Sequence, residues 1–286
     1  MKKFLTLLVT VIFSVAGVAA NASENATTGT PENCGQEQVL DALTGSIVSI
    51  GNAPCAEDAY ATFASDIWSG YMVTASFNKY IGVVGNVTVP ARSNFCTKSS
   101  WAGWIGLGGR NSHALIQVGI TYSKDSNAAR LFYEYLGFNS IYPAIYPLSY
   151  GFQAGTTVQL KLTYLPNSRA FTISAGYLGD TTPYVQTVAL PAGDVFYDGT
   201  SAEWVDERMS YLVNGQLVPS NLMDFDVVTW SAAKSLLVGG TYESIAAGNS
   251  TSLTMYDYPK ILAQPTYGLT NGQTFSDYWK ACDGTY

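Results

Sequence analysis

The chain has 286 residues, of which 47% are hydrophobic, 13% aromatic and only 12% charged, and its formal net charge is −7. This acidic balance argues against nucleic acids and anionic membrane surfaces as partners. The length allows one large domain or two smaller ones. The 20 tyrosines and 27 glycines are typical of β-strands joined by tight turns.

The N-terminus has the pattern of a secretory signal peptide. Two lysines precede an apolar run over residues 4–18, and Ala19-Ala20 supply a small-residue cleavage site. We therefore expect residues 1–20 to be removed and the protein to be secreted, with no membrane contact afterwards. A membrane anchor is the alternative, but the apolar run is short for a span. Removal leaves 12 basic and 21 acidic residues, so the net charge falls to about −9.

Residues 21–58 are polar at first, and a short helix-like pattern covers residues 37–43. Two interpretations remain open for this N-terminal extension. It is either a loosely packed leader or linker, or a short propeptide of the kind that secreted hydrolases often carry. Residues 59–286 are then expected to form a single domain, because no internal repeat or low-complexity linker follows residue 58.

The four cysteines are expected to form two disulfides in an exported protein, and three pairings are possible. A local bond between Cys34 and Cys55 leaves Cys96 to pair with Cys282. That second bond would clip the last strand to an early loop. A zinc site is not expected, because no C-x-x-C pair occurs and the chain has a single histidine.

From Ile67 onwards the pattern predicts β-structure. Alternation is clearest at residues 158–164, and Pro166-Asn167 turns this strand into the next one. Residues 123–130 and 139–151 are expected to be loops. In chain order, strands are predicted at residues 68–73, 81–89, 101–107, 114–122, 131–138, 158–164, 170–175, 183–190, 202–206, 225–230, 252–257 and 274–280. Short strands without a convincing helix predict an all-β fold, a two-sheet antiparallel β-sandwich of the concanavalin- or lectin-like jelly-roll type in one monomeric domain.

The residue inventory excludes most hydrolytic chemistries. His113 is the only histidine, no G-x-S-x-G sequence accompanies it, and the cysteines are expected to be oxidised. A Ser-His-Asp or Cys-His centre is therefore not predicted. The same shortage of ligands argues against a metal centre, and no phosphate-binding loop before a helix is evident, so we expect no cofactor. Carboxylate chemistry remains.

The most informative stretch is residues 201–207, which read as a strand. Its period of two places Glu203 and Glu207 on one face. Trp204 and Asp206 lie on the other face. A carboxylate in so sparsely charged a chain is costly to bury unless it has a partner or a role. For any single acid, an edge or outward-facing position is the alternative.

Several short segments follow one another in a recognisable order. They are Trp68-Ser69-Gly70, Val87-Thr88-Val89-Pro90, Trp104-Ile105-Gly106-Leu107-Gly108, Leu115-Ile116-Gln117-Val118-Gly119, Phe132-Tyr133-Glu134-Tyr135, Ala202-Glu203-Trp204-Val205 and Leu217-Val218-Pro219. Together, over residues 66–282, they resemble the glutamic peptidases, the eqolisin family of secreted acid endopeptidases. The matching family motifs are W-x-G, a strand ending in V-P, W-V-G-I-D-G, I-L-Q-T-G, W-Y-E-W, A-E-W/F-I and F-V-P.

The resemblance implies that Gln117 and Glu203 are the catalytic pair. It also implies that Trp68, Trp104 and Glu134 line the substrate groove. The implied substrates are proteins or peptides, and the family needs no metal. The family fold, two packed antiparallel sheets with the pair in the groove of the concave one, agrees with the strand pattern.

Three positions depart from the family pattern. Leu107 and Thr121 stand where the family usually has Asp, and Arg208 stands where it usually has a further acid. These departures bear on the acid pH optimum and on activity itself. Two alternatives therefore stay open: a carbohydrate-binding or glycoside-cleaving sandwich with Glu134 and Glu203 as facing acids, and a catalytically inactive family member that acts as a binding domain.

In the implied mechanism, ionised Glu203 holds a water molecule and takes its proton as the oxygen attacks the peptide carbonyl at acid pH. The carboxamide of Gln117 donates a hydrogen bond to the oxyanion and helps to hold the water. Trp204 is expected to be among the apolar neighbours of the Glu203 carboxyl.

Overall fold

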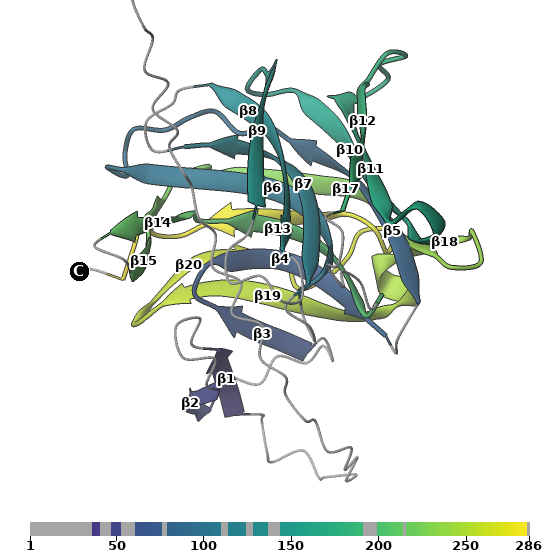
Figure 1. Ribbon diagram of the computed structural model, residues 1–286. Helices are drawn as coiled ribbons and strands as arrows, with labels where there is room; N and C mark the ends of the chain where they lie inside the picture. The colour runs from purple at the N-terminus through teal and green to yellow at the C-terminus, as the bar shows by residue number, and fades with distance from the viewer. Residues whose placement is uncertain are drawn as a thin grey trace, which may run out of the picture.

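The structure, a computed structural model, describes residues 36–40, 47–52, 61–75, 79–109, 114–123, 128–136, 144–190, 199–213 and 216–284. Within these residues the regular structure is β, apart from two 3₁₀ turns, η1 (Pro166–Ser168) and η2 (Ile245–Ala247). No helix in the described part of the chain is long and apolar enough to cross a membrane. The predicted all-β sandwich is confirmed (Figure 1).

The first of the two layers carries the segments singled out in the sequence. Its strands are β3 (Ala61–Ser65), β4 (Trp68–Thr74), β6 (Ser99–Gly108), β7 (Leu115–Tyr122), β8 (Ala129–Leu136), β9 (Ala144–Phe152), β13 (Ser201–Glu207) and β19 (Asn249–Asp257). They lie in the order β9-β8-β7-β6-β13-β4-β19-β3, and every pair is antiparallel except β19 with β3. We call this layer the first sheet.

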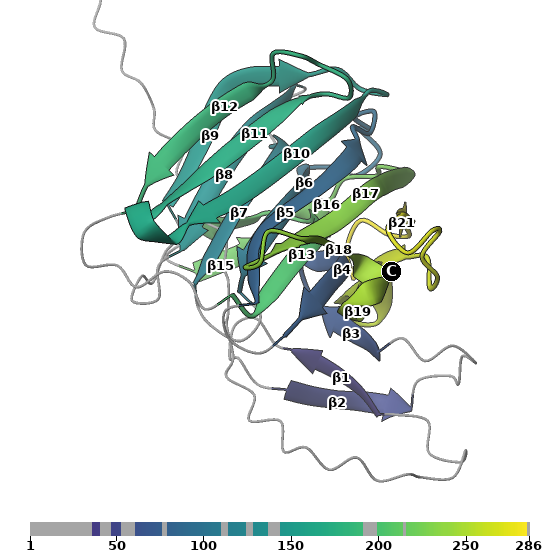
Figure 2. The same ribbon diagram turned by 90° about the vertical axis from the view of Figure 1, so that its right-hand side faces the viewer.

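The second sheet packs on one face of the first, as Figure 2 shows for β12, β11, β10, β5 and β17. Its strands are β5 (Tyr80–Thr88), β10 (Thr157–Leu165), β11 (Ala170–Tyr177), β12 (Tyr184–Ala189), β17 (Val227–Leu237), β20 (Lys260–Pro265) and β21 (Phe275–Trp279). Their order is β12-β11-β10-β5-β17-β21-β20, all antiparallel. Strand β20 also pairs with β19, which joins the two sheets at one side.

Six short strands complete the described structure. They are β1 (Gln36–Leu40), β2 (Ile47–Asn52), β14 (Ser210–Val213), β15 (Gln216–Pro219), β16 (Asn221–Leu222) and β18 (Tyr242–Ser244). Strands β14 and β15 pair only with each other. Strand β1 pairs with β2 and also, in parallel, with β3 at the border of the first sheet. The helix-like pattern at residues 37–43 is therefore not a helix over residues 36–40.

The main hydrophobic core lies between the sheets and contains the largest apolar side chains. Trp101, Trp204 and Trp230 are all fully buried there. The indole Nε1 of Trp204 donates to the carbonyl oxygen of Val84 at 2.9 Å, so a first-sheet side chain is bonded to second-sheet backbone. Full burial of one large apolar side chain stabilises the folded state by about 1.5–3 kcal/mol. The buried side chains between the sheets therefore hold the two sheets together.

One of the two expected disulfides is confirmed. Cys96 and Cys282 are bonded across 186 residues of sequence, with their Cα atoms 5.5 Å apart. The bond attaches the C-terminal segment to the loop before β6, and the backbone N–H of Leu222 donates to the carbonyl of Cys282 at 2.7 Å. Cys34 and Cys55 lie outside the described residues, as does the signal-peptide segment.

Candidate active site

The two residues predicted to be catalytic lie on one face of the first sheet, in a single cross-strand row. Glu203 of β13 is paired with Gly106 of β6, Gly106 with Gln117 of β7, and Gln117 with Glu134 of β8. Side chains of directly opposed residues on neighbouring strands point to the same face. The row crosses β13, β6, β7 and β8 of the first sheet (Figure 1). Trp104 and Leu115, which adjoin Gly106 in this row, belong to a hydrophobic cluster separate from the main core between the sheets.

The row leaves a gap between the carboxyl and the amide. Two strand spacings of about 4.8 Å separate the backbones of Glu203 and Gln117. The residue between them, Gly106, has no side chain, and a Cβ built there would lie 3.1 Å from Oε2 of Glu203 and 2.6 Å from the ring of Trp104. The absence of a side chain at position 106 therefore lets the two functional groups face each other over bare backbone.

Filling this gap is expected to reduce activity. Gly106→Ala should push the Glu203 carboxyl or the Trp104 ring aside, and a displacement of about 1 Å in a catalytic group can lower a rate about 100-fold. We expect kcat on a peptide substrate to fall about 10- to 100-fold, with cooperative thermal unfolding retained. Gly239→Ala is the matched control, because nothing lies within 4 Å of a Cβ at that position. Wild-type kcat in the Gly106 variant would contradict this account of the gap.

Glu134 makes a direct hydrogen bond to the amide. Nε2 of Gln117 donates to Oε2 of Glu134 at 2.7 Å, and both side chains are almost completely buried. Burial raises the pKa of Glu134 well above its usual range, the nearby carboxyl of Glu207 raises it further, and the hydrogen bond from Gln117 opposes the shift. Oε1 of Gln117 and Oε1 of Glu134 have no hydrogen-bond partner within the described residues.

Trp104 and Trp68 form an aromatic wall beside the row. Their rings meet edge to face, with centroids 5.2 Å apart. Nε1 of Trp104 donates to Oε2 of Glu207 at 2.7 Å, which fixes the indole. Burial raises the pKa of Glu207, the hydrogen bond from Trp104 partly opposes this shift, and the resulting pKa is about 8. The predicted groove residues thus share one face with Gln117 and Glu203, but Trp104 is buried and Trp68 is only partly exposed.

The exposed fraction of Glu203 and of Gln117 is 1% each. Apolar side chains surround them on this face, in a second hydrophobic cluster that includes Met72, Leu115 and Phe132. The side chains of Glu203 and Gln117 are therefore closed to solvent in this structure. The expected neighbour Trp204 is not among these side chains, because it points into the main core on the opposite face.

A further pair of acids lies on that opposite face. Asp206 accepts hydrogen bonds from Nε1 of Trp101 at 2.8 Å and from Nε1 of Trp230 at 2.9 Å. Its carboxyl interacts with that of Asp277 on β21, which accepts from the hydroxyl of Ser69 at 2.8 Å. Both acids are fully buried. The sequence pattern placed Asp206 on the correct face but gave no sign of its partner.

The three departures from the family pattern have different surroundings. Leu107 is buried in the main core. Thr121 lies at the site face, where its hydroxyl donates to the carbonyl of Trp101 at 3.0 Å. Arg208 forms a salt bridge with Asp257 at 2.8 Å and donates to the carbonyl of Asp66. None of the three touches the row directly through these contacts.

Two other sequence expectations concern ligands. His113, the single histidine of the sequence, lies outside the described residues. In the described part of the chain, no group of three or more His, Cys, Asp or Glu residues could hold a metal ion.

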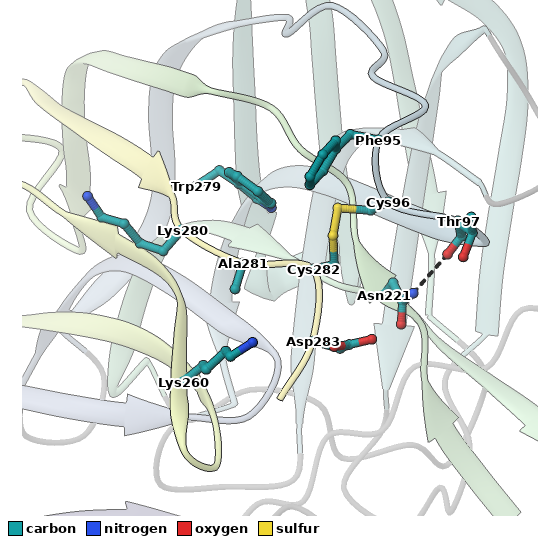
Figure 3. A pocket seen from close by; sticks show the side chains of 10 residues that line it. All are labelled: Phe95, Cys96, Thr97, Asn221, Lys260, Trp279, Lys280, Ala281, Cys282 and Asp283. Carbon is teal, nitrogen blue, oxygen red and sulfur yellow. Dashed lines mark hydrogen bonds between the residues drawn. A yellow bond between two sulfur atoms is a disulfide. The ribbon is translucent and has the colours of Figure 1, made fainter. Parts of the chain in front are cut away.

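A pocket of about 500 Å³ lies elsewhere, beside the disulfide (Figure 3). The rings of Phe95 and Trp279 meet edge to face at its rim with centroids 5.9 Å apart, and Lys260 lines it on the opposite side. No residue of the row lines this pocket. Its lining includes the carboxylate of Asp283 and the amide of Asn221, and Nδ2 of Asn221 donates to the carbonyl oxygen of Thr97 at 2.9 Å.

Comparison with known proteins identifies the family of the chain. The sequence model of the Peptidase A4 family matches residues 66–274 of this chain. The chain belongs to the Peptidase A4 family. This match confirms the resemblance to the glutamic peptidases, and the chain is a glutamic endopeptidase. No curated protein matches the chain by sequence.

Solved structures of a glutamic peptidase and of an eqolisin share the fold. The chain is similar to scytalido-glutamic peptidase with a peptide-based transition state analog, at TM-score 0.62 and 15% identity, with 75% of this chain and 98% of that chain covered. It is similar to SCP-B, an eqolisin in a complex with the tripeptide Ala-Ile-His, at TM-score 0.57 and 15% identity, with the same coverage. Aspergilloglutamic peptidase from Aspergillus niger matches at TM-score 0.48 and 16% identity over 63% of this chain and 99% of that chain.

Proposed function

We propose that this A4 peptidase hydrolyses peptide bonds with Glu203 and Gln117 as its catalytic pair. The observation that carries the proposal is their row on one sheet face, with only Gly106 between them. A single water molecule in that gap would touch both side chains. A carboxylate that can take a proton and an amide that can donate a hydrogen bond are the two functions that peptide hydrolysis requires.

The proposed reaction has two proton transfers. The carboxylate of Glu203 takes a proton from the water as its oxygen forms a bond to the peptide carbonyl carbon, and an N–H of Gln117 stabilises the oxyanion. The protonated Glu203 then gives this proton to the peptide nitrogen as the C–N bond breaks. The products are a carboxylic acid and an amine, and Glu203 returns to its starting state. Trp68 and Trp104 are proposed to contact the substrate beside this centre.

A glycoside-cleaving reaction with Glu134 and Glu203 has less support. Three strand spacings lie between β13 and β8, which amounts to about 14 Å between the two backbones. The two carboxyls of a retaining glycosidase lie about 5–5.5 Å apart and those of an inverting one about 6.5–9.5 Å, so both side chains would have to lean toward each other across Gly106 and Gln117. The Glu134 carboxyl is also bonded to Gln117 rather than directed toward Glu203. Gln117 has no required role in that chemistry.

The proposed biological setting is that of a secreted enzyme working at acid pH. The signal-like residues 1–20 support export, and residues 21–58 are proposed to be a short propeptide. In support of this, backbone pairing attaches β1 to β3 at the border of the first sheet, so an N-terminal extension is associated with the sheet that carries the row. Protein and peptide substrates follow from the family, and the protein is proposed to act as a monomer.

The basic test is an assay of the purified protein on an unfolded protein substrate between pH 2 and 6. We expect cleavage at internal peptide bonds that an inhibitor of aspartic peptidases does not block, because no pair of catalytic aspartates takes part. The same protein should not release sugars from polysaccharides. Absence of proteolysis after removal of residues 1–58, with the fold intact, would favour the inactive binding domain.

A further inference from the structure

Glu134 is hydrogen-bonded to the side-chain amide of Gln117. Its side chain is fully buried, and its Oε2 accepts from Nε2 of Gln117 at 2.7 Å. In the strand order β13-β6-β7-β8, Glu134 lies on the side of Gln117 away from Glu203. Glu134 therefore binds the Gln117 amide on the β8 side, and the remaining polar atoms of that amide are left for the β13 side, where Glu203 lies.

The hydrogen bond decides which way the amide points. A carboxamide has one acceptor oxygen and an NH₂ group with two donors, and a half-turn about its last bond exchanges them. With an acceptor oxygen of Glu134 on one side, the nitrogen turns toward Glu134. One N–H is then used, while the second N–H and Oε1 are left for the reaction. Oε1 of Gln117 has no hydrogen-bond partner within the described residues.

This division of atoms matches what the proposed mechanism asks of Gln117. The free N–H can donate to the oxyanion, and Oε1 can accept from the attacking water. In the flipped orientation, Oε1 would face Glu134, either against an acceptor oxygen or as the acceptor for a protonated carboxyl, and in both cases no acceptor would remain for the water. Only one of the two orientations therefore serves both catalytic functions.

We propose that Glu134 is a positioning residue that fixes the orientation of the Gln117 carboxamide, rather than a residue that contacts the substrate. The inference rests on the proposed role of Gln117. A neutral carboxylic acid keeps a carbonyl oxygen that can accept this bond, as does the side-chain amide of glutamine. Any group of the same shape without an acceptor should leave Gln117 free to turn.

Two variants of Glu134 distinguish the effect of its hydrogen-bond acceptor on Gln117 from the effect of its side-chain volume. Glu134→Gln keeps the size and an acceptor, and we expect kcat within about threefold of wild type. Glu134→Leu removes the acceptor, and we expect kcat to fall about 100-fold, with KM changed less than twofold, since a misoriented catalytic group typically costs that factor. The loss should be the same for peptides of different sequence. A residue that contacts substrate would instead change KM and the preferred cleavage site.

A double-mutant cycle tests whether Glu134 acts through Gln117. In a Gln117→Ala background, Glu134→Leu should change the residual kcat less than about twofold, because residues that act as a unit are not additive. An equal loss in both backgrounds, or wild-type kcat for Glu134→Leu alone, overturns the positioning role. Full activity of Gln117→Ala itself would instead overturn the proposed function. The two failures are thus distinguishable.

A spectroscopic measurement covers the case in which Glu134→Leu does not fold. In the wild-type protein, the two side-chain N–H protons of Gln117 should give well-separated NMR signals, one of them shifted by its hydrogen bond to Glu134. Gln117→Ala assigns these signals by their disappearance, and Glu134→Gln should move the shifted one. Two signals at the positions of a solvent-exposed glutamine would overturn the proposal without any variant of Glu134.

Discussion

Glu203→Gln is expected to lower kcat by about 1,000-fold or more, because an amide cannot take a proton from water and general base catalysis contributes about 10²–10⁴-fold. The substitution keeps the size of a side chain that is 1% exposed, so the fold should be unchanged. The measurement is kcat and KM on a defined peptide at the pH of maximal activity. KM should change little, because Glu203 acts on the water rather than on the bound chain.

Gln117→Ala should lower kcat by about 10²–10³-fold, the usual effect of removing one oxyanion donor. Combining it with Glu203→Gln should give far less than the product of the two losses, because both side chains act on one water molecule. The matched controls are Gln159→Ala, an exposed amide on β10 of the second sheet, and Glu243→Gln, an acid in a partly exposed salt bridge with Lys79. Both controls should retain wild-type kcat. Proteolysis at the wild-type rate by either catalytic-pair variant would refute the assignment of the pair.

Local patterns predicted the face on which the acids lie. The period of two at residues 201–207 depends only on the pleat of a single strand, and it correctly separated Glu203 and Glu207 from Trp204 and Asp206. The same pattern could not say which strands lie next to β13. The expectation that Trp204 adjoins the Glu203 carboxyl was wrong because neighbours in sequence point to opposite faces of a strand, as the same period of two implies.

The register of the sheet was the missing information. The pairing of Glu203 with Gly106 joins residues that are far apart in sequence, and the pairing of Gln117 with Glu134 depends on the register of two successive strands. Nothing within a single strand specifies such a pairing. The family resemblance supplied the identities of the proposed catalytic pair, but the position of Gly106 between them, and the contact that Glu134 makes, come from the packing of four strands.

Strand β9 shows a second limit of local patterns. Residues 139–151 were expected to be a loop, yet residues 144–152 form a strand. Pro147 and Gly151 interrupt its pattern, and both are unfavourable inside a sheet. Among the described strands β9 pairs only with β8, so it lies at a border of the first sheet, where a missing backbone N–H can be tolerated.

The buried acid pair predicts a large dependence of stability on pH. Burial raises the pKa of Asp206 to about 7, although its indole and carboxyl hydrogen bonds lower it. Burial, together with the charge of Asp206, raises the pKa of Asp277 well above its usual range. Ser69, Trp101 and Trp230 supply hydrogen bonds but no positive charge. The folded protein therefore keeps protons on this pair at pH values where the unfolded chain has lost them.

The sign of the effect follows from this difference in bound protons. The contribution to stability is complete below the unfolded pKa of about 4 and is lost as pH rises through the folded value, at about 1.4 kcal/mol per pH unit for each retained proton. Between pH 4.5 and 6.5 one such proton corresponds to about 3 kcal/mol, or a fall of roughly 6–12 °C in Tm for a protein of this size. Thermal unfolding followed across this range measures the slope, and a Tm that rises with pH would contradict the prediction.

Two asparagine variants assign this slope to the acid pair, because the two carboxyls have different partners. Asp277→Asn mimics the protonated acid, so it should match wild-type stability at pH 4, exceed it at pH 7, and reduce the slope by about 1.4 kcal/mol per pH unit. Asp206→Asn turns an NH₂ group toward the indole N–H of Trp101 or Trp230, and this unpaired donor should cost about 1–3 kcal/mol of stability at every pH.

The control variant is Glu243→Gln, in a partly exposed salt bridge, which should leave the slope of stability against pH unchanged. An unaltered slope in Asp277→Asn would mean that other groups bind the extra proton. The buried acids Glu134 and Glu207 on the opposite face would be the next to test, since burial raises the pKa of each.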